Sequence, residues 1–86
     1  MQDFESLRQR LDEHYDWPAV YTFKFIVPRA SSKDLLSLFE SDTGMSVRES
    51  RGGKYLSLTA TVLMPGSESV IAVYEAATEI EGIISL

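Results

Sequence analysis

The chain has 86 residues, of which 44% are hydrophobic and 24% charged, with a net charge of −5 and no cysteine. This length favours one small domain with a modest core, and the lack of cysteine excludes disulfide bonds, thiolate metal ligands and cysteine nucleophiles. The acidic balance argues against a protein that binds nucleic acid mainly by releasing counterions from phosphates. The sequence begins without a signal-peptide pattern and has no apolar run of roughly 20 residues, so we expect a cytoplasmic protein that does not enter a membrane.

Residues 3–14 are predicted to form a short amphipathic helix, an extension of the single domain that spans residues 1–86. Phe4, Leu7 and Leu11 recur at helical spacing and make a narrow apolar stripe. We expect this stripe to pack on a sheet edge or on a second subunit.

Residues 21–27 are predicted to form the first strand, because successive side chains there alternate in character as a strand requires. The face expected to meet the core is apolar and largely aromatic: Tyr21, Phe23, Phe25 and Val27. The opposite face holds Thr22, Lys24 and Ile26.

The rest of the chain is predicted to alternate between helix and strand. The expected elements are a helix over 33–41 capped by Ser31 or Ser32, a strand over 45–50, a turn over 51–54, a strand over 55–64, a helix from 67 to about 79 and a strand over 83–86. The long strand would present an apolar face to the core, and its other face carries Tyr55, Ser57, Thr59, Thr61 and Leu63.

This order of elements, a helix followed by β-α-β-β-α-β, favours one common arrangement when crossovers are right-handed. It is the α+β ferredoxin-like sandwich, an antiparallel four-stranded sheet of order 4-1-3-2 with two helices on one face. The other face of the sheet then stays open.

No motif for catalysis or cofactor binding is found in the sequence. His14 is the only histidine, which leaves too few nitrogen and sulfur ligands for a zinc site and no further histidine to activate a serine. A P-loop and a dinucleotide-binding fingerprint are also missing. We therefore expect a protein that is not an enzyme and that uses no metal or cofactor.

A group of basic and hydroxyl-bearing residues defines the first candidate site. In the expected fold, the end of the first strand, the start of the first helix of the sandwich and the hairpin turn meet at one end of the sheet. That end gathers Arg29, Ser31, Ser32, Lys33, Arg51, Gly53 and Lys54. Because a helix N-terminus attracts anions, one hypothesis is a site for a small anionic ligand. The alternative is that these side chains are solvated and balanced by Asp34, Glu49 and Glu81.

The open sheet face is the second candidate site, for a homodimer or for a partner protein. It is too apolar for ordinary solvent-facing surface and too polar for a core. Its expected residues are Thr22, Lys24, Ile26, Tyr55, Ser57, Thr59, Thr61 and Leu63.

RNA or other nucleic-acid binding through the basic hairpin end is the alternative function. Residues 51–55, Arg-Gly-Gly-Lys-Tyr, are similar to the start of an RNA-recognition motif, which has the same βαββαβ order. That recognition needs aromatic side chains on the open face of both central strands. In this chain only Tyr55 is expected on the open face, because the alternation of the first strand directs Phe23 and Phe25 toward the core.

Three segments carry a resemblance to a known family: Trp17-Pro18 with residues 21–26, residues 50–59, and Val73-Tyr74-Glu75 running to Ile80. Over residues 17–86 the chain resembles the YbeD-like family of small bacterial proteins of unknown function. The resemblance implies a fold similar to ACT regulatory domains, which bind amino acids and pair through their sheets. Amino-acid-binding ACT domains commonly have a glycine in the loop after the first strand, and residues 28–32 have none. We therefore expect a non-enzymatic regulatory or adaptor module that binds a protein or a small anion.

Overall fold

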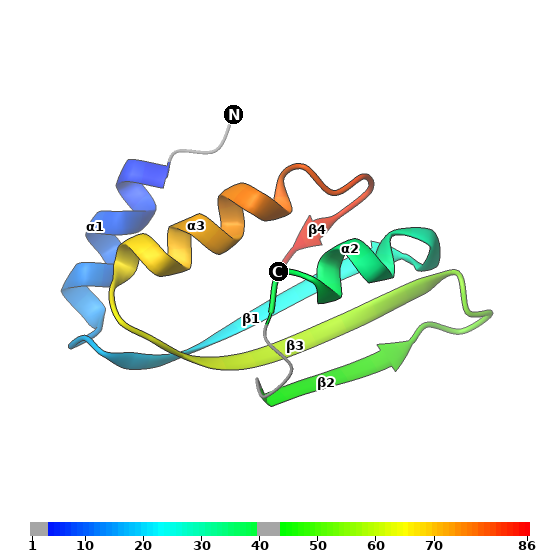
Figure 1. Cartoon of the computed structure of the whole chain (residues 1–86), viewed down its shortest axis with the longest axis horizontal. Coiled ribbons are helices and arrows are strands. Elements are labelled where there is room, and N and C mark those ends of the chain that lie inside the picture. Colours follow the sequence, from blue (N-terminus) through cyan, green and yellow to red (C-terminus); the bar gives the residue numbers. More distant parts are fainter. Residues whose placement is uncertain (1–3, 40–43) are drawn as a thin grey trace.

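The computed structural model describes residues 4–39 and 44–86. Figure 1 shows a sheet with the helices stacked over one of its faces. In chain order the elements are α1 (Phe4–His14), β1 (Ala19–Pro28), the short 3-10 helix η1 (Arg29–Ser31), α2 (Ser32–Leu36), β2 (Gly44–Glu49), β3 (Tyr55–Met64), α3 (Ser67–Ala77) and β4 (Ile84–Ser85).

The four strands form one antiparallel sheet of order β2-β3-β1-β4. Read from the other edge, this is the predicted order 4-1-3-2, and it is compatible with a ferredoxin-like arrangement. The central strands pair along their whole length, from Ala19 opposite Met64 to Pro28 opposite Tyr55. The β4 strand is much shorter and pairs only at Phe25 and Ile26.

The core lies between the sheet and the helices, and the predicted parity of β1 is confirmed. Phe23 and Val27 have no exposed surface, and Phe25 is 1% exposed. They pack with residues of the facing β3 side and of the helices, including Leu58 and Val70. The aromatic rings of β1 contact those of Phe39 and Tyr74, with ring centroids between 5.3 and 6.5 Å apart.

Helix α1 is confirmed within one residue of its predicted bounds, and it packs against α3 in the helix layer. Leu11 is buried, and Phe4 and Leu7 are partly buried against the core. The apolar stripe thus covers a neighbouring helix, where a sheet edge or second subunit was expected. A weak ion pair, 3.9 Å between Arg8 and Glu68, also joins the two helices.

The helix predicted over residues 33–41 is shorter than expected and begins earlier. The chain turns from Pro28 into η1 and then into α2, which ends at Leu36, while residues 40 and 41 lie outside the described part. The prediction that Ser31 or Ser32 caps this helix is wrong, because no side-chain cap hydrogen bond forms. The Ser31 hydroxyl instead donates to the carbonyl of Glu81 at 3.0 Å.

The remaining bounds differ from the prediction by a few residues. β1 begins at Ala19, two residues early, and α3 ends at Ala77. The final strand is only Ile84–Ser85, although the backbone N–H of Leu86 still donates to the carbonyl of Lys24 at 2.9 Å. β3 has the predicted bounds.

Candidate functional site: the open sheet face

The open face of the sheet brings together all eight residues predicted for it. Register fixes their neighbours, because directly opposite residues of an antiparallel pair point to the same face. The cross-strand pairs on this face are Val20 with Leu63, Thr22 with Thr61, Lys24 with Thr59, Ile26 with Ser57, and Pro28 with Tyr55. The two central strands therefore present a stripe of hydroxyl groups between two apolar ends.

Large apolar side chains are exposed at both ends of this face. At one end, Val20 and Leu63 are 57% and 65% exposed. At the other end, Ile84 lies opposite Ile26 and is 52% exposed, and Tyr55 is also exposed. Sequence reasoning missed Val20 and Ile84, although the same alternation that placed Leu63 would have placed them.

The charge of the open face has a single sign. Lys24 lies on β1, and Arg48 joins it from β2 because Arg48 pairs with Ser57. No Asp or Glu among the described strand residues shares this face, since Glu49 pairs with Leu56 and so has the opposite parity. The face is therefore weakly basic on a protein whose net charge is −5.

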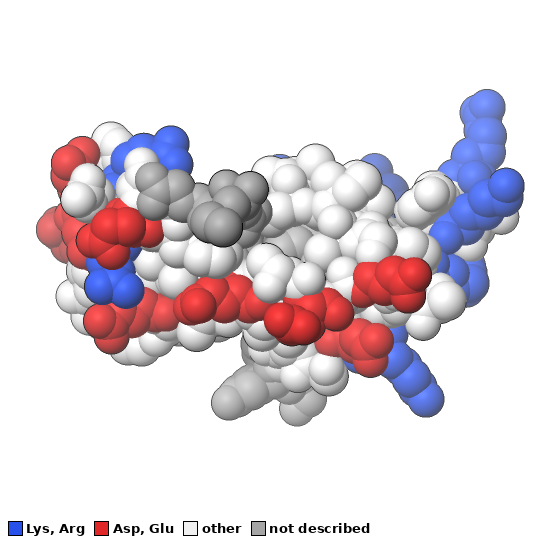
Figure 2. Space-filling model, turned by 90° about the horizontal axis from the view of Figure 1, so that it is seen from above, with Lys and Arg blue, Asp and Glu red and all other residues white. Residues whose placement is uncertain are grey.

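Acidic residues gather instead on the helix side. Figure 2 shows a row of acidic side chains across the helix layer, while basic side chains extend from the end where the β2–β3 hairpin lies. The segment from α3 onward carries four glutamates and no basic residue: Glu68, Glu75, Glu79 and Glu81. The sheet, its hairpin and η1 together carry five basic residues and one acidic residue, Glu49. The basic ones are Lys24, Arg29, Arg48, Arg51 and Lys54.

Arg29 holds together the basic corner, which is the end of the sheet where the first candidate site was predicted: Arg29, Ser31, Ser32, Lys33, Arg51, Gly53 and Lys54. Its backbone N–H donates to the carbonyl of Lys54 at 3.0 Å, and its Nε donates to the carbonyl of Gly53 at 2.7 Å. Its guanidinium also forms an ion pair with Glu49. Arg29 thus ties the start of η1 to the hairpin turn, and these contacts occupy donors that an anion would need.

The other predicted residues of this corner differ in whether they form hydrogen bonds or ion pairs. Ser31 is bonded to the Glu81 carbonyl. Lys33, Arg51 and Lys54 are exposed, and none of them forms an ion pair within the described residues. Helix α2 has only five residues, which gives it a weak dipole. The corner therefore combines a structural clamp with solvated cations.

Among the described residues, one group has a strongly shifted pKa: Tyr74, which is partly buried against the core. Burial raises the pKa of the Tyr74 phenol well above its usual value, and the hydrogen bond with Tyr21, 2.9 Å between the hydroxyl oxygens, raises it further. Within residues 4–39 and 44–86, no group of three or more His, Cys, Asp or Glu side chains is placed to hold a metal ion. No helix in the same ranges is long and apolar enough to cross a membrane.

These features define a small α+β domain whose sheet is covered by helices on one face and open on the other. The chain belongs to the family described as protein of unknown function (DUF493), whose model matches residues 12–86. The match covers the whole sheet and leaves most of α1 outside it. Comparison with curated proteins and with solved structures gives no match.

Proposed function

We propose that this protein is a non-enzymatic adaptor module that binds an acidic partner protein through its open sheet face. The observation that carries the proposal is the combination on that face of exposed apolar side chains with cations that form no ion pair within the described residues. Val20 and Leu63 are each more than half exposed beside a hydroxyl-rich stripe that includes Lys24. Contiguous apolar surface rimmed by polar groups marks interaction sites on small proteins.

The charge of the face favours a different protein over a second copy of this chain. Two open faces placed against each other would bring Lys24 and Arg48 of both copies together without a facing carboxylate. Like charges at an interface oppose association, whereas an acidic partner surface would steer it. The homodimer suggested by the sequence is therefore the less favoured occupant of this face.

The finer classification of the fold belongs to the same proposal. The sheet order, with all helices on one side, is consistent with a ferredoxin-like sandwich of the ACT type. The resemblance of residues 17–86 to the YbeD-like family supports this classification, and ACT domains act as regulatory modules. A regulatory role in a bacterial cytoplasm fits this set of features.

Site-specific photo-crosslinking tests the proposal. A photoreactive phenylalanine analogue replaces Thr61 on the open face or, as the matched control, Ala76 on the exposed side of α3. We expect an acidic protein to be crosslinked from position 61 and not from position 76. With that protein purified, Lys24→Glu should weaken binding by about tenfold or more, while Glu75→Lys should not weaken it.

Two results would contradict this function. One is capture of the same protein equally well from both positions, which would place the contact elsewhere. The other is capture from position 61 with an affinity that Lys24→Glu leaves unchanged, because the charge argument would then fail. Absence of any crosslinked protein at position 61 in intact cells would also count against the proposal.

RNA binding at the hairpin end is the second candidate, because exposed Arg51 and Lys54 lie in the turn just before the exposed Tyr55. Fluorescence anisotropy with a labelled single-stranded RNA at two salt concentrations tests it. Binding that weakens with salt and is lost in a Lys54→Ala variant, but is unaffected by Leu63→Ser, would favour this function. The opposite dependence on the two variants would favour the open face.

A further inference from the structure

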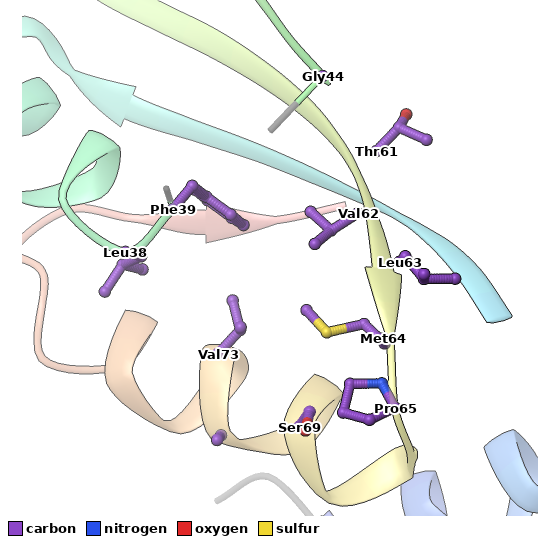
Figure 3. A pocket seen from close by; sticks show the side chains of 11 residues that line it. Leu38, Phe39, Gly44, Thr61, Val62, Leu63, Met64, Pro65, Ser69 and Val73 are labelled. Carbon is purple, nitrogen blue, oxygen red and sulfur yellow. The ribbon is translucent and has the colours of Figure 1, made fainter. Parts of the chain in front are cut away.

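A cavity of about 590 Å³ lies on the covered side of the sheet, away from the open face. Figure 3 shows its walls: Val62 and Met64 from β3, Val73 from α3, and Leu38 and Phe39 from the turn after α2. All five side chains point toward the same space. This volume falls within the range of roughly 300–1,000 Å³ that is typical of small-molecule sites.

The cavity exists because the helix layer does not reach over the β2 side of the sheet. Helix α2 has only five residues and ends at Leu36. Val47 on β2 illustrates this gap. It lies opposite the buried Leu58 and so faces the helix side of the sheet, yet it is 49% exposed. The helix-facing side of the sheet is therefore left partly uncovered along β2 by the described helices.

Within the described residues, the lining of the cavity is uncharged. Its two polar side chains are Thr61, which points away toward the open face, and Ser69 of α3. Within the described residues the Ser69 hydroxyl makes no hydrogen bond, although its backbone N–H bonds to Gly66 at 3.2 Å. The cavity thus offers one free hydroxyl and otherwise apolar walls.

We propose that this cavity binds a neutral, largely apolar small molecule with one polar group directed at Ser69. A charged ligand would lose its hydration without gaining a counter-charge, which is costly. This site is distinct from the partner surface proposed above, because Val62 and Met64 lie on the helix-facing side of β3, although Thr61 and Leu63 of the open face also border the cavity.

Two probes with the same ring system test the charge requirement. N-phenyl-1-naphthylamine is neutral and fluoresces in apolar sites, and 1-anilinonaphthalene-8-sulfonate adds one sulfonate to it. We expect the neutral probe to bind about tenfold or more tightly than the sulfonate. Equal affinities, a preference for the sulfonate, or no binding of the neutral probe would overturn the proposal.

Two tryptophan substitutions on α3 locate the neutral probe. Ala72 lines the cavity and is exposed, whereas Ala76 is exposed one turn further along and does not line it. We expect Ala72→Trp to weaken probe binding by about tenfold or more by filling the mouth, and Ala76→Trp to leave it within about twofold. Equal effects of the two substitutions would place the probe outside this cavity and overturn the proposal, provided that circular dichroism shows both variants folded.

Discussion

Val20 and Leu63 lie directly opposite each other in the two central strands, on the sheet face that no described helix covers. Their exposures of 57% and 65% contrast with the complete burial of Phe23, which lies three residues after Val20 on the other face. The pair thus supplies apolar area that the chain itself does not bury. Such area is available to a partner without any cost to the core.

Replacing Leu63 by serine should therefore leave the folded state almost unchanged. We expect the free energy of unfolding, measured by urea denaturation, to change by less than about 1 kcal/mol, the upper range of a cross-strand pair. The same variant should reduce crosslinking of the partner from position 61. A stability loss of about 3 kcal/mol would show instead that Leu63 is buried in the free protein.

Replacing Phe23 by alanine tests the opposite face of the same strand. Phe23 has no exposed surface, and its ring contacts those of Tyr21, Phe39 and Tyr74. The cost should be about 3–5 kcal/mol, which is enough to unfold many domains of this size. Thr22→Ala, one residue away on the open face, is the control and should cost less than about 1 kcal/mol. Similar losses in both variants would mean that the two faces are wrongly assigned.

The sequence predicted best where the signal is local and periodic. The alternation from Tyr55 to Met64 defines β3 with its observed bounds, because a strand's side-chain period is set by its own backbone. The β1 strand was predicted to start at residue 21, after the break at Trp17-Pro18. The observed start at Ala19 adds Val20 to the open face, where it lies opposite Leu63.

The sequence predicted worst where distant groups compete with local ones. Leu38 and Phe39 were expected to extend a helix, yet each donates its N–H to a carbonyl three residues earlier, in a tighter turn. Ser31 was expected to cap that helix, but its hydroxyl bonds to Glu81, 50 residues away. The clamp made by Arg29 also depends on contacts with residues 20 or more positions away in the chain. The cavity likewise depends on tertiary structure, because its size is set by how far the helix layer extends over the sheet.

The Arg29 clamp should order the hairpin more than it stabilises the whole domain. Arg29→Lys keeps the charge but loses the fork that joins Gly53 and Glu49. Because both partners of the ion pair are largely exposed, we expect a global cost below about 1 kcal/mol. Amide hydrogen exchange at Gly53 and Tyr55, whose N–H groups bond within the turn, should become faster. Unchanged exchange at both amides would show that the turn holds without the clamp.

Two glycines with positive φ allow the stability cost of backbone strain to be measured separately from the cost of steric overlap. Gly82 has φ +76° and a Cβ there would lie 2.7 Å from Cγ of Pro28, whereas Gly52 has φ +86° and open space around it. Gly52→Ala should cost about 1–2 kcal/mol from the left-handed conformation alone. Gly82→Ala should cost more, because Pro28 or the loop must also move. Thermal unfolding of the two variants measures the difference, and equal losses would show that the loop before β4 yields freely.

The Tyr21–Tyr74 hydrogen bond predicts a specific dependence of stability on high pH. Burial, and then the hydrogen bond with Tyr21, raise the pKa of Tyr74 in the folded state above its unfolded value of about 10. The folded state therefore prefers the neutral phenol, so its contribution to stability is complete below about pH 10 and is lost as the pH rises through the folded pKa.

Tyr74→Phe removes both the titrating group and the hydrogen bond. At pH 7 we expect the variant to be less stable by about 0.5–1.5 kcal/mol, because the Tyr21 hydroxyl loses its partner. Above pH 10 the wild type should lose stability faster than the variant, so the difference should shrink. Urea unfolding followed by the fluorescence of Trp17, the single tryptophan, measures both. A Tyr74→Phe profile parallel to the wild type would mean that Tyr74 ionises as freely in the folded state as in the unfolded chain.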